Sequence, residues 1–364
     1  MAALRAGLHR LMVALTVLLL APPAVRAAVY SWNVLSGDWS AALSWTGGTT
    51  LPASGDTAYV ANGGTATVDT TGPTCNTLFL GGTGGGAVLM TTGSFAATTE
   101  HIGSYGSGTF TQSGGTNTAG TLDFSEGSSG NGVYNLAGGT LIASAIADPN
   151  NESACLNLGG GTLQAGASFS TSYWMNFTLP SGGVNATVNT AGYALTLAGT
   201  ISGPGGLIKA GGGTLTLGTA GFSPNIYAGT TLISGGVLAL GNSAALQEST
   251  LDASGAGTLS FGSLGAAPLG GLTGPGFISL TNATGGTVAT TSAKPALGIY
   301  GNGRAVFYDA SGYNWPTTNS TGSPFTLSGA TAAALNVPLP ASGATSATNY
   351  LRSGSGSVAA GQLV

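Results

Sequence analysis

The segments Gly108-Thr-Phe-Thr-Gln-Ser-Gly-Gly-Thr116 and Gly132-Val-Tyr-Asn-Leu-Ala-Gly-Gly-Thr140 align residue for residue at an offset of 24. Within each segment apolar and polar residues alternate, as in a β-strand with one face in a core. The phrase Gly-Gly-Thr-Leu and its variants return along the chain, and paired glycines begin at positions 114, 138, 160, 182 and 205. Their separations of 24, 22, 22 and 23 residues are typical of one supersecondary unit stacked on itself.

Three short strands separated by glycine turns fill one such period, because glycine adopts the positive φ of tight turns without strain. Strands this short gain a core only from the rungs stacked on either side. The pattern therefore predicts an all-β protein, a right-handed parallel β-helix, whose inward side chains stack as ladders. The residues expected in this core are Phe110, Tyr134, Leu141, Leu163, Leu215, Leu217, Leu238 and Leu240.

Residues 1–27 have the pattern of an export signal. Arg5 and Arg10 form a basic start, residues 11–20 are mostly apolar, and small residues precede Ala28. A membrane-spanning helix needs about 18 or more apolar residues, and no later stretch offers them. We expect the mature chain to be exported, extracellular or on the cell surface, with outer-membrane association as an alternative, and to have no transmembrane segment.

Three further regions follow the signal. Residues 28–74 hold Trp32, Trp39 and Trp45, and we expect this Trp-rich segment to cap the first rung. Residues 75–262 carry the repeats. In residues 263–364 the period fades and prolines interrupt it, although 276–280 and 305–308 still have strand character. Three readings of this irregular C-terminal β region stay open: a ragged continuation of the stack, a small β-module, or a partly flexible tail.

Charge and cysteine content narrow the function classes. The signal contains three of the seven basic residues, so the mature chain has four basic against eleven acidic residues, a net charge of −7. Its scattered cations argue against nucleic-acid binding, which needs clustered Lys and Arg.

Cys75 and Cys155 are the only thiols. They are separated by several rungs of roughly 4.8 Å each, so we expect two buried thiols without a disulfide.

The stretch from Leu158 to Ala245 carries a longer motif. It contains Gly159-Gly-Gly-Thr-Leu-Gln164, Gly203-Pro-Gly-Gly-Leu207, Lys209-Ala-Gly-Gly-Gly-Thr-Leu-Thr-Leu217 and Tyr227-Ala-Gly-Thr-Thr-Leu-Ile-Ser-Gly-Gly-Val-Leu238. This stretch resembles the autotransporter-associated β-strand repeat. The resemblance implies a bacterial, secreted or surface passenger with a structural or adhesin role, and it brings no catalytic residues. No anchoring module of such proteins is recognisable before Val364, so we expect a fragment or a truncated product.

Catalytic and metal-binding chemistry is sparse. Acidic residues come close in sequence only as Asp123 with Glu126, Asp148 with Glu152, and Glu248 with Asp252, and each pair is typical of solvated turns rather than of glycoside hydrolysis. The one mature histidine, His101, follows Glu100 and is expected at the surface. With one histidine and two distant thiols we predict no zinc site, no other metal and no cofactor.

Two glycine-rich stretches imitate ligand motifs. Gly81-Gly-Thr-Gly-Gly-Gly-Ala-Val-Leu89 is similar to a calcium-binding nonapeptide, but Gly86 stands where the ligand aspartate is needed. Gly103-Ser-Tyr-Gly-Ser-Gly108 has the spacing of a nucleotide loop without a helix after it. Both are interpreted as turns between strands.

The leading hypothesis is a non-catalytic, elongated surface protein, a stalk or adhesive passenger. The alternative is a polysaccharide-binding module or polysaccharide-degrading enzyme on the same scaffold. Extracellular polysaccharide or other cell-surface components would be its partners. Sugars stack on exposed aromatic rings, so the candidate contacts are the aromatic pairs Tyr173 with Trp174 and Tyr313 with Trp315.

Overall fold

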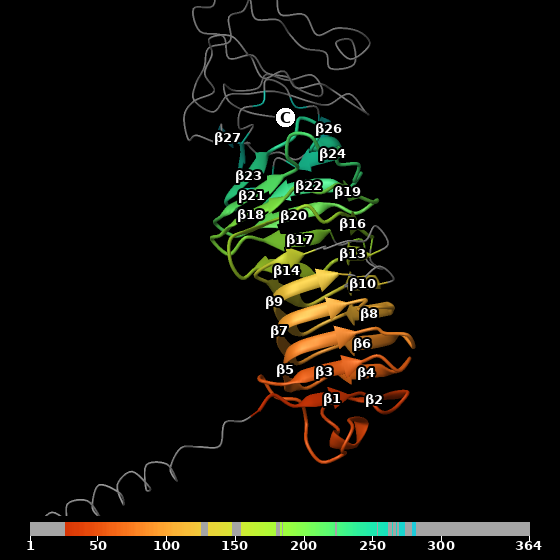
Figure 1. The fold of residues 1–364 in the computed structure, drawn as a ribbon. Coiled ribbons are helices and arrows are strands. Elements are labelled where there is room, and N and C mark those ends of the chain that lie inside the picture. Colours follow the sequence, from red (N-terminus) through yellow and green to blue (C-terminus); the bar gives the residue numbers. More distant parts are fainter. Residues whose placement is uncertain are drawn as a thin grey trace, which may run out of the picture.

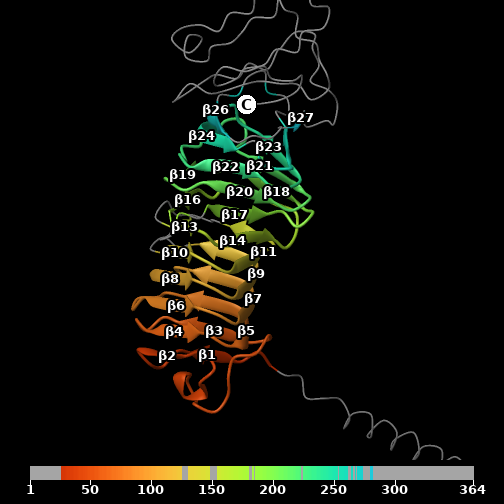
Figure 2. The same ribbon diagram turned by 180° about the vertical axis from the view of Figure 1, so that it is seen from behind.

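The computed structural model describes residues 26–124, 130–147, 154–179, 183, 185–222, 224–252, 254–260, 264, 267, 269–273 and 279–281. Through these residues the chain winds into an elongated stack of short strands (Figures 1 and 2). Each pairing between the named strands is parallel, and consecutive rungs lie one above the other. The predicted all-β, parallel β-helix is therefore confirmed.

The strands form three sheets. The first contains β1 (Val29–Ser31), β3 (Thr57–Val60), β5 (Thr71–Leu80), β7 (Ser94–Ile102), β9 (Thr116–Phe124), β11 (Thr140–Ala143), β12 (Ile146–Ala147), β14 (Thr162–Ala165), β17 (Ala186–Asn189), β20 (Leu207–Ala210), β22 (Thr230–Ile233), β24 (Leu246–Asp252) and β26 (Leu269–Thr273). The second contains β2 (Ser36–Asp38), β4 (Thr65–Val68), β6 (Gly86–Met90), β8 (Ser107–Gln112), β10 (Asn131–Leu136), β13 (Cys155–Leu158), β16 (Met175–Phe177) and β19 (Ile201–Ser202). The third contains β15 (Phe169–Thr171), β18 (Ala194–Leu197), β21 (Thr214–Leu217), β23 (Val237–Leu240), β25 (Thr258–Ser260) and β27 (Ser279–Thr281).

The rung changes shape part-way along the rod. The long strands β5, β7 and β9 each cover two sides of a rung, whereas the next rung divides the same path into β11 and β12, both paired with β9. From β15 onward the second of these sides is a sheet of its own. Up to β19, where the second sheet ends, the later rungs thus carry three separate short strands in place of one long and one short strand.

The pairing register reproduces the sequence period. Thr57, Thr77, Thr99 and Thr121 are successive Cα partners across β3, β5, β7 and β9, at spacings of 20, 22 and 22 residues. Their side chains are partly exposed, while the residues that follow them are buried. The alternation seen in the sequence therefore sets which side chains enter the interior.

One column of glycines shows why the turns need this residue. Gly86, Gly108 and Gly132 stack in register where β6, β8 and β10 begin. A Cβ atom at any of them would collide with a backbone carbonyl, that of Val60, Leu80 or Ile102 respectively. Close passage of backbone past backbone at this corner thus excludes every other residue.

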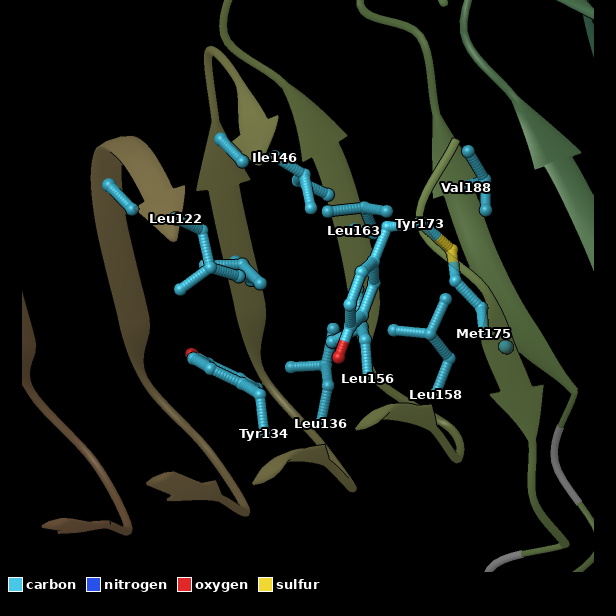
Figure 3. Close-up of a cluster of buried hydrophobic side chains, with 14 of the residues drawn as sticks. Leu122, Tyr134, Leu136, Ile146, Leu156, Leu158, Leu163, Tyr173, Met175 and Val188 are labelled. Atoms are coloured by element: carbon cyan, nitrogen blue, oxygen red, sulfur yellow. The ribbon is translucent and has the colours of Figure 1, made fainter. Parts of the chain in front are cut away.

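The interior is a continuous apolar core (Figure 3). All eight residues predicted to lie in the core are at most 2% exposed, which confirms that part of the prediction. Like residues stack on one another: the rings of Phe110 and Tyr134 lie parallel with centroids 4.7 Å apart. Such ladders supply both apolar burial and ring contacts from one rung to the next.

The Trp-rich segment closes the N-terminal end of the stack. Trp32, Trp39 and Trp45 are at most 3% exposed and meet edge to face, with Trp45 in the middle. After the short 3-10 helix η1 (Ala42–Ser44), residues 44–46 return beside β1, where Asn33 N donates to Ser44 O and Thr46 N to Ser31 O. This return covers part of an edge that would otherwise offer unpaired backbone groups. The stacked sheets themselves begin at β1, inside the segment predicted as a cap.

At the other end the stack continues past residue 262. Strands β26 and β27 pair in register with β24 and β25, so the described part of the C-terminal region prolongs the rungs. The predicted strand at 305–308 lies outside the described residues. Among the described residues no helix is long and apolar enough to cross a membrane.

Both cysteines are free, as expected from their separation along the stack. Cys75 is buried on the inner side of β5. Cys155, expected to be buried, is instead partly exposed, because it occupies an outward position at the start of β13.

Candidate functional site

The predicted sugar contacts have different surroundings. Tyr173 is 2% exposed, and its ring stacks on Phe124 at a centroid distance of 4.5 Å. Figure 3 shows it pointing into the interior beside Leu156 and Leu163. Its neighbour Trp174 is 38% exposed and keeps a surface available for a ligand. Tyr313 and Trp315 lie outside the described residues.

Of the three acidic pairs noted in the sequence, only Glu248 with Asp252 lies wholly among the described residues. Glu126, Asp148 and Glu152 lie outside the described residues. Glu248 is exposed, while Asp252 accepts a hydrogen bond from the backbone N–H of Ser254, 2.8 Å away, as turn residues do. In the described chain no group of three His, Cys, Asp or Glu side chains is placed to hold a metal ion.

His101 belongs to an outward ladder. Its Nδ1 lies 3.1 Å from Oδ2 of Asp123 on the next rung, and both side chains are 16% exposed. On its other side the imidazole stacks on Phe79 at 4.6 Å, and Phe79 stacks on Tyr59 at 4.7 Å. His101 was expected at the surface, and the structure places it on the outer side of β7, mostly covered by its neighbours in this stack. A threonine column, Thr57 to Thr121, runs beside it.

A second outward ladder consists of asparagines. Asn157 Nδ2 donates to Asn135 Oδ1 at 2.8 Å, and Asn176 Nδ2 donates to Asn157 Oδ1 at 3.2 Å. Cys155 Sγ also donates to Asn157 Oδ1, at 3.1 Å. These bonds link β10, β13 and β16 through side chains, in addition to the backbone bonds of the sheet.

Glu100 occupies an unexpected place. It is 0% exposed and points inward from β7, between Leu78 on β5 and Leu122 on β9 in the same register column. The sequence did contain the signal, since Thr77-Leu-Phe-Leu80, Thr99-Glu-His-Ile102 and Thr121-Leu-Asp-Phe124 align at an offset of 22. That alignment places the glutamate where its neighbours have leucine.

A chain of buried polar side chains surrounds this carboxyl group. Asn117 Nδ2 donates to Glu100 Oε2 at 3.1 Å and to the hydroxyl of Tyr134 at 3.0 Å. The Tyr134 hydroxyl donates to Gln112 Oε1 at 2.7 Å. Gln112 Nε2 then donates to the carbonyls of Gly115 and Thr140. The side chains thus come from β7, β8, β9 and β10 and meet in the middle of the rod.

The electrostatics of this cluster follow from its burial. Burial raises the pKa of Glu100 to about 8, although its hydrogen bond from Asn117 acts in the opposite direction and lowers it. Burial, and then the nearby Glu100 carboxyl, raise the pKa of Cys75 well above its usual range, with Asp56 as a further cause. Burial raises the pKa of Tyr134 in the same way. All three groups therefore hold their protons at neutral pH.

Lys209 is the buried cation of the described chain's C-terminal half. It is 0% exposed, and its Nζ donates to the carbonyls of Ala210, Gly211 and Gly235 at 2.8 to 2.9 Å. All three donors of the ammonium group are thereby used. Burial lowers its pKa to about 8, so the group is mostly charged at neutral pH.

No family model, no curated protein and no solved structure matches this chain. The functional argument therefore rests on the geometry. The side chains of Glu100 and Lys209 are buried in the interior and out of reach of a partner. Among the described residues, the outward ladders and exposed aromatic side chains such as Trp174 and Phe222 are groups that a partner would meet.

Proposed function

We propose that this chain is an exported, non-catalytic surface protein whose β-helix acts as an elongated stalk or adhesive passenger. The β-solenoid itself is the established part, and it is compatible with a structural role. Export, surface location and adhesion are the proposed parts, as is membership of the autotransporter-associated β-strand repeat proteins. Their support is the signal-like residues 1–27 and the repeat motif of residues 158–245.

The observation that carries the proposal is the nature of the outer surface. Ser94, Thr116, Thr140, Thr162 and Thr187 form a register column along the first sheet, each partly exposed. Hydroxyl columns of this kind favour a scaffold, because a polysaccharide-cleaving enzyme needs two carboxyl groups facing each other across a substrate. The close outward contact of a carboxyl group with another ionisable side chain in the described chain is instead that of Asp123 with His101.

Recombinant residues 28–364 test the non-catalytic role. We expect no release of reducing ends from a panel of bacterial and plant polysaccharides. Reproducible release, abolished by Asp123→Asn, would contradict the proposal. In solution scattering the same protein should contain a rod at least roughly 50 Å long, from twelve levels of the first sheet.

Export is tested separately with residues 1–27 fused to a reporter that is active only outside the cytoplasm. The fusion should be active, and the same fusion carrying Leu18→Asp and Leu19→Asp should not. Equal activity of the two fusions would contradict the proposed export, and it would have no bearing on the fold.

One observation favours polysaccharide binding as a second candidate function: Trp174 stays 38% exposed beside a buried Tyr173. A glycan array comparing the mature chain with Trp174→Ala tests it. Phe222→Ala is the matched control, since Phe222 is another exposed aromatic residue, 46% accessible. Binding lost in the first variant and kept in the second would support a sugar contact at Trp174.

A further inference from the structure

The buried cluster around Glu100 leaves two acceptor atoms without a donor. Glu100 Oε1 and Asn117 Oδ1 are both shielded from solvent and have no hydrogen-bond partner. They belong to the same two groups that already share the bond from Asn117 Nδ2 to Glu100 Oε2. Two buried oxygens without a hydrogen-bond donor are unfavourable, since each loses its hydration and gains no protein partner in return.

The amide and hydroxyl donors of the cluster are all engaged elsewhere. Both hydrogens of Asn117 Nδ2 are used, one on Glu100 and one on Tyr134. The Tyr134 hydroxyl donates to Gln112, whose own amide hydrogens go to the carbonyls of Gly115 and Thr140. Since Asn117 Nδ2 and Glu100 Oε2 are already 3.1 Å apart, a hydrogen carried by Glu100 Oε1 and directed at Asn117 Oδ1 would satisfy both oxygens at once.

We propose that Glu100 is a proton-binding site in the core, where its neutral carboxyl group forms a closed acid–amide pair with Asn117. In this pair Asn117 Nδ2 donates to Glu100 Oε2, and Glu100 Oε1 donates its proton to Asn117 Oδ1. A carboxylic acid has one O–H donor and an amide has both a donor and an acceptor, so the two groups are complementary. Binding adds one proton to the carboxylate, and no bond between heavy atoms changes.

The surroundings favour the neutral acid. Leu78 and Leu122 flank Glu100 in its register column and offer no charge. The titratable groups that face it are the thiol of Cys75 on β5 and the phenol of Tyr134 on β10, and burial raises the pKa of both. Asp56 acts on Cys75 rather than on the Glu100 carboxyl. The charged neighbours on its own sheet, His101 and Asp123, point to the outer side.

The consequence is a core whose stability depends on pH. The folded pKa of Glu100, about 8, lies above its ordinary value of 4.5. The folded state therefore holds the proton more tightly than the unfolded state. The stability contributed by this proton is complete below about pH 4.5 and is lost as the pH rises to about 8. Over that window one proton changes the folding equilibrium constant by about tenfold per pH unit.

Urea unfolding of residues 28–364 from pH 4.5 to 8 tests the pair, with the wild-type chain compared with Glu100→Gln. A glutamine keeps the shape and supplies an N–H donor to Asn117 Oδ1 at every pH, so this variant should lose the tenfold dependence per pH unit. Histidine also titrates in this range, so both chains are measured again with His101→Gln as the control background. Equal pH dependence with and without Glu100→Gln would overturn the proposal.

Infrared spectroscopy of the folded wild-type chain gives a second readout that needs no variant to fold. At pH 7 the carbonyl stretch of a protonated carboxyl group should be present, and it should disappear as the pH is raised past 8. A spectrum with ionised carboxylates alone at pH 7 would overturn the proposal. So would a stability that depends on sodium or ammonium concentration and not on pH, since a cation would then occupy the place of the proton.

Discussion

Glu100 and Lys209 are both fully buried ionisable residues, in two different parts of the rod, and the protein accommodates them differently. Lys209 stands near the end of β20, where the carbonyls of Ala210, Gly211 and Gly235 come within 2.9 Å of its Nζ. Glu100 lies inside β7, and the amide of Asn117 is its one hydrogen-bond donor in the cluster. The cation stays charged, and the acid stays neutral.

The difference follows from what the backbone offers at each place. At a turn, carbonyl oxygens with spare lone pairs point in several directions, and three of them can converge on one ammonium group. Within a parallel sheet the N–H groups are committed to the neighbouring rungs, so an inward carboxylate finds no backbone donors. The charge of Lys209 is therefore accommodated at the end of β20, beside a turn, whereas the carboxyl group of Glu100 inside β7 is kept neutral.

The largest expected effect on stability is that of replacing Lys209. Lys209→Met keeps an apolar stem of similar length and removes the ammonium group, so the partly buried carbonyls of Gly211 and Gly235 lose their charged donor, while that of Ala210 keeps its bond from Thr190 N. We expect the free energy of unfolding to fall by about 3 kcal/mol, because each acceptor left unpaired costs about 1 to 3 kcal/mol. Urea unfolding at pH 7 measures this. Ile208→Met, at the adjacent outward position, is the control and should change stability by less than about 0.5 kcal/mol.

A somewhat smaller effect on stability is expected when the hydrogen-bond partner of Glu100 is replaced. Asn117→Leu leaves the carboxyl group of Glu100 and the hydroxyl of Tyr134 without their amide partner, and it should lower the free energy of unfolding by about 2 kcal/mol. The double variant Glu100→Leu with Asn117→Leu removes both partners, and Leu78 and Leu122 show that leucine suits the column. It should recover most of the loss. A double variant as unstable as the sum of its parts would contradict this account.

The free energy of unfolding is expected to depend on pH in opposite directions at Glu100 and at Lys209. Lys209 has a folded pKa of about 8, below its ordinary 10.5. Its contribution is therefore complete above about pH 10.5 and is lost as the pH falls through 8. Between pH 8 and 9 the free energy of unfolding should rise by up to about 1.4 kcal/mol from this group. Lys209→Met should abolish that rise in the urea midpoint, whereas Glu100→Gln should leave it unchanged.

The smallest effect is expected on the outer surface. Thr140→Ala removes one hydroxyl group from the outward column of the first sheet, where it is partly exposed. The free energy of unfolding, followed through the midpoint of thermal unfolding, should change by less than about 0.5 kcal/mol. A larger loss would mean that the hydroxyl columns stabilise the rod itself, and the surface argument for a scaffold would weaken.

Residue alternation and glycine spacing were sufficient to predict the stack and its core. Phe110 and Tyr134 were placed inward from the offset of 24 alone, and they stack at 4.7 Å. The same reasoning did not place Glu100, because it considered this glutamate only as the neighbour of His101, the residue expected at the surface. It also offered Tyr173 as a sugar contact, although the ring lies in the core against Phe124.

The amino-acid sequence by itself determined the winding, because one inward residue in two and a glycine at each tight corner allow few other packings of so short a repeat. Only the tertiary structure decided which polar groups meet in the interior. Glu100, Asn117 and Tyr134 come from three strands and are brought within hydrogen-bonding distance by the stacking of rungs. Their contacts depend on side-chain direction and on the register between rungs, and a linear pattern states neither the distance between two such atoms nor the proton that they share.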